Sequence, residues 1–283
     1  MSNQNYLSIY AKSFNWAGFF LPKKTYQKCS ALYDFCRIVD NTADDENSIE
    51  FKKIKFKDFE NNFNQKNFDN PIIKRMWELI EEFNISLKIV HDLFDGIRSD
   101  INEKVILSSK KELLIYSYRV AGTVGLMMAK ILKVKKKSSL KSAIDLGIAM
   151  QLTNISRDVI EDLNNGRSYI KENFDDIKST IKLSEKFYEN SFYSINEIPI
   201  SFRFSILVAR RVYRKIGYKI LNKKNFENYK KSGKIYVSNL EKVIETFISI
   251  FDLIKLLLIN KNDEYLQHDH FLISEELNLN ERI

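Results

Sequence analysis

The chain has 283 residues, a net charge of +8 and 44% hydrophobic side chains, a content that excludes intrinsic disorder and suffices for a large core. Glycine (8) and proline (3) are too scarce for the tight turns of a many-stranded β-sheet protein. The basic balance suits an anionic membrane or a phosphorylated substrate, whereas nucleic-acid binding would need a basic stripe with interleaved aromatic residues, which the sequence lacks.

Helical periodicity dominates, and no segment alternates as a β-hairpin strand would. A helix is predicted from Pro22 to Asp44, followed by a polar, Asn- and Lys-rich connection over residues 46–70. Further helices are predicted over residues 71–100, 110–133, 140–163, 174–196, 201–221 and 235–259. Because no change in composition marks a domain boundary, we predict one all-α domain over residues 1–283.

Two pairs of aspartates stand four residues apart within predicted helices: Asp40 with Asp44, and Asp158 with Asp162. Residues at this spacing share one helix face, where like charges cost each helix roughly a few tenths of a kcal/mol. A shared divalent cation would turn this repulsion into ligation, and Mg²⁺ prefers hard oxygen ligands. Two such helices facing each other would hold Mg²⁺ from both sides; the alternative is chance spacing on solvated helix ends.

The first pair continues a polar stripe, since Tyr33 and Arg37 precede Asp40 at one-turn steps. Such a stripe would be an unusual choice for a solvated helix face. The arginine offers forked donors that suit phosphate oxygens. The segment therefore predicts a site for a metal-bound diphosphate.

The second pair continues a similar stripe through Gln151 and Asn154, with Arg157 on the adjoining flank of Asp158. Burying an amide without partners costs a few kcal/mol, roughly, so amides are poor choices for a core face. Apolar residues surround the stripe, which indicates a wet, lined cavity; the alternative is an unusually polar solvent face.

A third segment, from Tyr116 to Gly125, carries the small residues Ala121, Gly122 and Gly125 at helical spacing. Small residues usually permit close helix packing. The alternative is that they leave room for an apolar chain, and periodicity does not separate the two.

Together these segments resemble the squalene/phytoene synthase family of head-to-head prenyl synthases. The resemblance covers most of the chain, from Lys12 to Ser238. Its motifs are Tyr33-x-x-Cys36-Arg37-x-x-Asp40-x-x-x-Asp44, Tyr116-x-x-x-Val120-Ala121-Gly122-Thr123-Val124-Gly125, and Gln151-Leu152-Thr153-Asn154-Ile155-x-Arg157-Asp158-Val159-x-Glu161-Asp162 with Gly166-Arg167-x-Tyr169.

This resemblance implies an isoprenoid synthase fold, with helices around a central cavity and the aspartate-rich helices facing each other across it. It implies a Mg²⁺-dependent condensation, with Mn²⁺ as an alternative metal, of two allylic diphosphates through a cyclopropyl diphosphate. Three groups of residues carry over: Asp40, Asp44, Asn154, Asp158 and Asp162 as metal ligands, Ser13, Arg37, Gln151 and Arg157 as substrate-binding residues, and Tyr33 and Tyr116 near the carbocation.

Within the family, the motifs most resemble bacterial phytoene synthases, which join two geranylgeranyl diphosphates without NADPH. Alternatives are a C30 synthase using farnesyl diphosphate and a non-catalytic member acting as an assembly factor; such members tend to lose the aspartates that this chain keeps. The chain departs from the family pattern at Asn41, where a second Asp is frequent, at Lys171, which replaces a common Pro, and at Ala11, which replaces a frequent Ser.

The sequence shows no signal peptide and no spanning segment, which predicts a cytoplasmic protein, with peripheral contact at the inner face of a membrane as an extension. The most apolar stretch, residues 244–259, is predicted to form a buried terminal helix, and a membrane-surface helix is the alternative. His268 and His270 lie in a polar tail and are predicted to be solvated.

Overall fold

The structure, a computed structural model, describes residues 12–44, 47–258 and 270–283. Two short strands, β1 (Val105–Ile106) and β2 (Arg167–Ser168), pair in parallel. The helices are α2 (Lys12–Gly18), α3 (Lys23–Asp44), α4 (Ile49–Asn64), α5 (Pro71–Phe83), α6 (Leu87–Ser99), α7 (Lys110–Ser117), the π-helix η1 (Tyr118–Gly122), α8 (Thr123–Ile131), α9 (Lys137–Arg157), α10 (Val159–Asn164), α11 (Phe174–Phe192), the 3₁₀ helix η2 (Tyr193–Glu197), α12 (Ile200–Leu221), α13 (Phe226–Lys231), α14 (Asn239–Leu258), α15 (His270–Ser274) and the 3₁₀ helix η3 (Leu279–Glu281).

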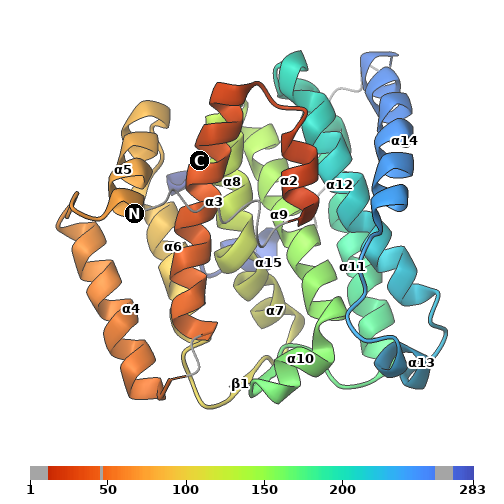
Figure 1. The fold of residues 1–283 in the computed structure, drawn as a ribbon, viewed down its shortest axis with the longest axis horizontal. Coiled ribbons are helices and arrows are strands. Elements are labelled where there is room, and N and C mark those ends of the chain that lie inside the picture. The colour runs from red at the N-terminus through yellow and green to blue at the C-terminus, as the bar shows by residue number, and fades with distance from the viewer. Residues whose placement is uncertain (1–11, 45–46, 259–269) are drawn as a thin grey trace.

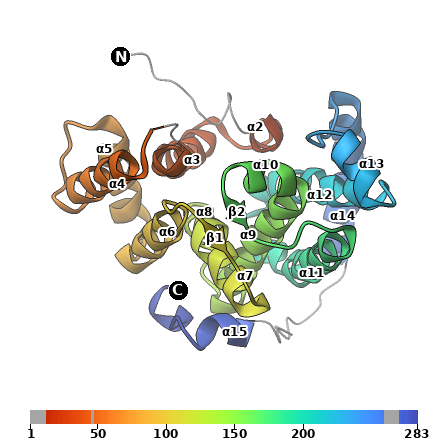
Figure 2. The ribbon, with the colours of Figure 1, turned by 90° about the horizontal axis from the view of Figure 1, so that it is seen from below.

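The predicted all-α fold is confirmed, with the helices arranged around α9. This helix packs against α8, α11 and α12, and in Figure 1 the long helices run roughly side by side. Seen from below in Figure 2, α3 to α6 form one flank and α11 to α14 the other, with α9 between them. The two acidic segments consequently stand on separate helices on either side of the interior, since one belongs to α3 and the other to the end of α9 and to α10.

The connection predicted over residues 46–70 is wrong, because this segment contains helix α4. Ser48 caps its start by accepting a hydrogen bond from the backbone N–H of Phe51 at 3.3 Å. On its inner face Phe56 and Phe63 are buried, and the Phe63 ring packs on that of Phe35 in α3. Lysines, asparagines and acidic residues make up most of the outer side, with Phe51 and Ile54 exposed among them, and this mixture obscured the apolar spacing.

Two predicted helices are each interrupted. The helix over residues 71–100 is split at Asn84, which ends α5 in the left-handed conformation at φ 49°, and Ser86 then caps α6. The helix over residues 140–163 breaks at Asp158, whose φ of −104° and ψ of 14° separate α9 from α10. The helix over residues 110–133 is continuous but includes the π-turn η1, which periodicity did not indicate.

The C-terminal third corrects three expectations. The helix predicted over residues 235–259 begins only at Asn239, and its last predicted residue lies outside the described ranges. Helix α13, which precedes it, was not predicted. The prediction of a buried terminal helix is wrong, because the apolar side of α14 faces solvent. His270 is buried against Asp145 rather than solvated, whereas His268 falls outside the described residues. Within those ranges, none of the helices has both the length and the apolar character required to cross a bilayer.

Close packing between α9 and the η1–α8 segment depends on glycine. A Cβ atom on Gly147 would overlap the carbonyl oxygen of Ala121, and one on Gly125 would overlap that of Ala143. The small residues of this segment therefore allow two helix backbones to approach each other, as the packing interpretation predicts. Ala121 and Gly125 also reach the cavity described below.

Substitution of Gly147 by alanine should lower the free energy of unfolding by about 1–3 kcal/mol, because backbone atoms must move to relieve the overlap. Gly217→Ala is the matched control, since its Cβ would lie at an ordinary 3.4 Å from Ile181. In that control the better helix propensity of alanine should leave stability unchanged or raised by up to about 1 kcal/mol. Urea denaturation of the wild type and both variants measures their free energies of unfolding. A Gly147→Ala protein as stable as the Gly217→Ala control would contradict this packing.

Candidate functional site

A single cavity of about 1520 Å³ brings the predicted site residues together. They come from α2, α3, α7, α9 and α10, segments far apart in sequence. All the predicted residues line this cavity: Ser13, Tyr33, Arg37, Asp40, Asp44, Tyr116, Gln151, Asn154, Arg157, Asp158 and Asp162. The convergence places both acidic segments on one cavity, although Asp44, at the end of α3, remains exposed.

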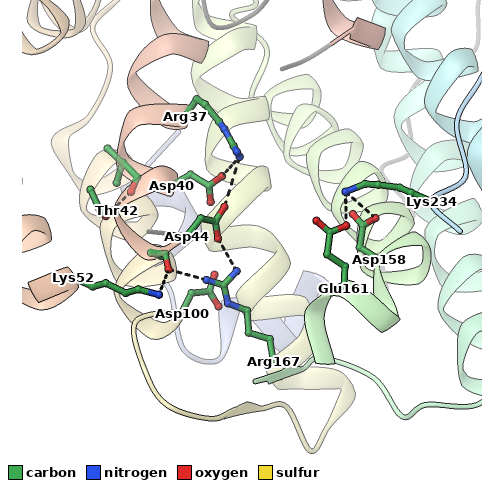
Figure 3. Close-up of polar contacts among 12 residues, drawn as sticks. Arg37, Asp40, Thr42, Asp44, Lys52, Asp100, Asp158, Glu161, Arg167 and Lys234 are labelled. Atoms are coloured by element: carbon green, nitrogen blue, oxygen red, sulfur yellow. Dashed lines mark hydrogen bonds and ion pairs between the residues drawn. The ribbon is translucent and has the colours of Figure 1, made fainter. Parts of the chain in front are cut away.

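The first acidic pair lies on α3 beside an arginine one turn earlier (Figure 3). Arg37 Nη1 is 2.5 Å from Asp40 Oδ2 and 3.9 Å from Asp44 Oδ2. Burial, together with the neighbouring Asp44 carboxylate, raises the pKa of Asp40 to about 6 despite the opposing effect of Arg37. The positive charge around Asp40 is thus too small to offset the effects of burial and of Asp44 on its pKa.

The second acidic pair spans the break between α9 and α10. Arg157 donates two hydrogen bonds to Asp158, at 2.8 and 2.5 Å. Lys234, from the chain before α14, lies 3.5 Å from Asp158 Oδ1 and 2.5 Å from Glu161 Oε2 (Figure 3). Among the described residues none forms an ion pair with Asp162, and burial and then the Asp158 charge raise its pKa to about 8.

Arg167 connects the two acidic sets and was assigned no role from the sequence. Its guanidinium donates to Asp44 Oδ1 at 2.9 Å and to the carbonyl of Ala43 at 3.2 Å (Figure 3). Its charge also lowers the pKa of both Asp40 and Asp162 against the larger effect of burial. Arg167 is thus bonded to the first acidic set and has an electrostatic effect on the second, and all of these residues line the same cavity.

The backbone around Arg167 explains how it reaches this position. Arg167 belongs to β2, which pairs with β1 in the register Val105 to Arg167. Gly166 before it has φ +75°, and a Cβ there would lie 2.6 Å from the carbonyl oxygen of Glu103. Only glycine fits this close approach in the left-handed region. The Gly-Arg dipeptide was thus the sequence signal that could have identified Arg167.

A buried trio links Tyr116 to two residues that sequence reasoning did not assign. Asp100 accepts hydrogen bonds from Tyr116 at 2.7 Å and from Tyr169 at 2.8 Å, and the two hydroxyls are 2.9 Å apart. Burial, reinforced by the Asp100 charge, raises the pKa of both phenols, so they remain protonated. Asp100 comes directly after α6 and meets its two tyrosines across 16 and 69 positions of sequence, which is why no pattern within one helix marked it.

The donor set fits a metal ion that is bound together with an anionic ligand. Within residues 12–44, 47–258 and 270–283, no three His, Cys, Asp or Glu side chains lie close enough to hold an ion by themselves. However, the buried Oδ1 of Asn154 has no hydrogen-bond partner among the described residues. An orphan oxygen and two carboxylates of raised pKa suit Mg²⁺, which commonly joins one or two carboxylates to substrate phosphates.

Away from the carboxylates, much of the lining consists of small and apolar residues, with several serines and Lys242 among them. Along α9 the lining continues from Asn154 back to Ser142, a distance of about 18 Å at 1.5 Å per residue. There Ser142 and Ser194 of η2 form a hydrogen bond of 2.7 Å, and Leu146 lies between the two ends. A cavity with a charged end and a long apolar end suits a ligand with an anionic head and an apolar chain.

Comparison with known sequences gives a result consistent with this geometry. The family described as squalene/phytoene synthase matches residues 8–173. The 15-cis-phytoene synthase of Pantoea ananas is 29% identical over 247 residues, which cover 76% of this chain and 80% of the relative.

Comparison with solved structures agrees. A dehydrosqualene synthase solved with a ligand is 28% identical and superposes with a TM-score of 0.76, covering 88% of this chain and 94% of the other. A squalene synthase from Alicyclobacillus acidocaldarius, 18% identical, superposes with a TM-score of 0.65 over 79% of this chain and 91% of the other, which supports the fold alone.

Proposed function

The chain belongs to the squalene/phytoene synthase family and is an enzyme of the head-to-head prenyltransferase type; from this premise we propose that it condenses two geranylgeranyl diphosphates to phytoene. The reaction passes through a cyclopropyl diphosphate and releases two diphosphates. The observation that carries the proposal is the convergence of both acidic segments on one cavity with a long apolar end. Both substrates are accommodated there with their heads toward the aspartates.

The proposal gives the charged residues distinct tasks. Asp40, Asp44, Asn154, Asp158 and Asp162 hold Mg²⁺, or Mn²⁺ in its place, and the metal supplies Lewis-acid stabilisation of the departing diphosphate. Arg37 and Arg157 exchange their present carboxylate partners for phosphate oxygens, for which a forked guanidinium is suited. Ser13 and Gln151 add polar contacts at the same end of the cavity.

The uncharged lining protects the reacting chain. The phenols of Tyr33 and Tyr116 lie at the cavity wall, and burial keeps both protonated by raising their pKa values. They offer electron-rich rings to an allylic cation without offering a nucleophilic phenolate. The apolar wall from Leu146 to Ser142 excludes water, which would otherwise quench the cation.

The C40 product is favoured by the phytoene synthases among the relatives. The runner-up is a C30 product from farnesyl diphosphate, which the likeness to a dehydrosqualene synthase structure supports. A non-catalytic assembly role is disfavoured because all four aspartates are present and line one large cavity.

Incubation of the purified protein with Mg²⁺ and either geranylgeranyl or farnesyl diphosphate, with and without NADPH, followed by product identification, separates these functions. We expect phytoene from geranylgeranyl diphosphate without NADPH. A C30 hydrocarbon or alcohol from farnesyl diphosphate alone would establish the runner-up. Absence of product from both substrates would favour the non-catalytic role.

Metal binding should strengthen as pH rises. The pKa values of about 6 for Asp40 and about 8 for Asp162 mean that both carboxyls must lose protons before ligation. The increase in Tm on adding Mg²⁺ with inorganic diphosphate should therefore be larger at pH 8.5 than at pH 6. Differential scanning fluorimetry measures it, with diphosphate alone as the control at each pH. An increase that is the same at both pH values would contradict the assignment.

A further inference from the structure

Helix α14 has its polar and apolar faces reversed relative to an ordinary surface helix. Lys242, Glu245, Ser249 and Asp252 are buried on its inner side. On its outer side Phe247 is 63% and Phe251 70% exposed. The exposed apolar residues, which we call the α14 face, are Leu240, Val243, Ile244, Phe247, Ile250, Phe251, Ile254, Leu257 and Leu258.

Ion pairs with α12 fix this orientation. Arg211 donates to both oxygens of Asp252, at 2.5 and 2.8 Å, and lies 3.5 Å from Glu245. Lys215 adds a contact of 3.4 Å to Glu245. Rotating α14 to bury its phenylalanines would separate these partly buried charges and leave them unpaired, which is costly. The exposed α14 face is therefore enforced by its contacts and does not arise from loose packing.

The α14 face adjoins the cavity. The chain over residues 234–239 and the buried Lys242 in the first turns of α14 both line the cavity wall. In Figure 1, α14 stands at the edge of the molecule, and an extended chain leads down from its start to α13. One side of the helix thus contacts the cavity while the other side meets the exterior.

Positive charge is concentrated in the chain that leads into α14. Between α12 and α14 the chain carries Lys223, Lys224, Lys230 and Lys231 against the single acidic residue Glu227, in addition to the cavity-facing Lys234. Three of these four lysines are exposed, and Lys223 is half-buried. A basic segment followed by an apolar helix face matches a lipid surface with anionic headgroups, and the aromatic residues suit its interface.

We propose that the α14 face docks this protein on an anionic lipid bilayer, with the lysines of residues 223–231 contacting the headgroups. The biological role of this docking rests on the proposed function, because a hydrocarbon product that leaves the cavity needs an apolar phase to enter. Burial of phenylalanine and isoleucine side chains supplies the affinity, and the lysines supply its dependence on salt.

Sedimentation with vesicles of equal parts phosphatidylcholine and phosphatidylglycerol tests this docking without any prenyl substrate. The wild-type chain should bind, less strongly at high salt, and Phe247→Ser/Phe251→Ser should reduce vesicle partitioning at least tenfold. Phe51→Ser/Ile54→Ser on α4, which removes side chains 48% and 60% exposed, should bind as the wild type does. Activity of all three proteins in detergent should be the same.

Two outcomes would overturn the proposal. One is equal vesicle binding by the wild type and by the α14 variant. The other is a wild-type chain that ignores vesicles but sediments as a dimer in their absence, with the dimer lost in the α14 variant, since a second copy would then cover the α14 face. Loss of activity in all proteins together with normal vesicle binding would instead count against the proposed function.

Discussion

Replacing Asp162 by asparagine should lower kcat/KM by about three orders of magnitude while making the metal-free protein more stable. Under the proposed metal assignment, the substitution removes one ligand and with it several kcal/mol of stabilisation of the charge on the leaving diphosphate, and each factor of ten in rate corresponds to about 1.4 kcal/mol. The opposite effect on stability follows from the surroundings of Asp162, where burial and Asp158 both disfavour its ionised form.

The sign of this stability effect depends on pH. The folded-state pKa of Asp162, about 8, lies above its ordinary value of 3.8. The fold therefore binds a proton that the unfolded chain releases, and the stability this proton provides is complete below pH 4 and is lost as pH rises to about 8. Asparagine, which needs no proton, should gain about 2 kcal/mol over aspartate above pH 8 and nothing at pH 4.

Urea denaturation without metal, paired with steady-state kinetics in Mg²⁺, measures both effects. Asp175→Asn is the matched control, because the side chain of Asp175 is 94% exposed at the start of α11 and lies outside the cavity lining. It should change neither quantity. An Asp162→Asn protein that lost stability above pH 8, or retained full activity, would contradict the metal-site assignment.

The sequence predicted the parts of the site that depend on spacing within one helix. Tyr33, Arg37, Asp40 and Asp44 share a face of α3, as their three- and four-residue steps require. Asp158 departs from regular helix, yet the break keeps it and Asp162 at the same cavity. Local periodicity was sufficient here because each stripe belongs to one short segment.

Contacts between distant segments could not be predicted in this way. Asp100 joins Tyr116 and Tyr169 only through the tertiary fold, and Arg167 reaches Asp44 across 123 positions of sequence. Helix α4 was missed because its polar face outnumbers its few buried phenylalanines. For α14, burial was inferred from apolar content, whereas the ion pairs made by Asp252 and Glu245 decide which side faces inward.

Replacing Arg167 by glutamine should lower the stability of the metal-free protein, whereas Asp162→Asn should raise it. Its guanidinium is bonded to Asp44, and its charge lowers the pKa of Asp40 in one acidic set and of Asp162 in the other. Removing this partly buried cation leaves several carboxylates with less compensation, which should cost about 2–4 kcal/mol at pH 8. We also expect at least a hundredfold loss of kcat/KM, because positive charge disappears from the end of the cavity where the proposed function places the diphosphates.

The pH dependence and the response to metal distinguish this role from simple packing. At pH 5 the carboxyls of Asp40 and Asp162, with pKa values of about 6 and about 8, are largely protonated, so less repulsion remains for Arg167 to offset. The stability difference between Arg167→Gln and the wild type should therefore shrink from pH 8 to pH 5. Addition of Mg²⁺ at pH 8 should recover part of it, because the ion replaces the missing positive charge.

Arg98→Gln is the matched control, since Arg98 is 48% exposed and pairs with Glu60 at 2.6 Å on the outer surface. Such an exposed pair contributes about 0.2–1 kcal/mol, and its removal should show no response to Mg²⁺. Urea denaturation of both variants at the two pH values, with and without Mg²⁺, makes the comparison. If Arg167→Gln lost as much stability at pH 5 as at pH 8, and Mg²⁺ restored none of it, Arg167 would serve packing alone, and the two acidic sets would not act on a common cation.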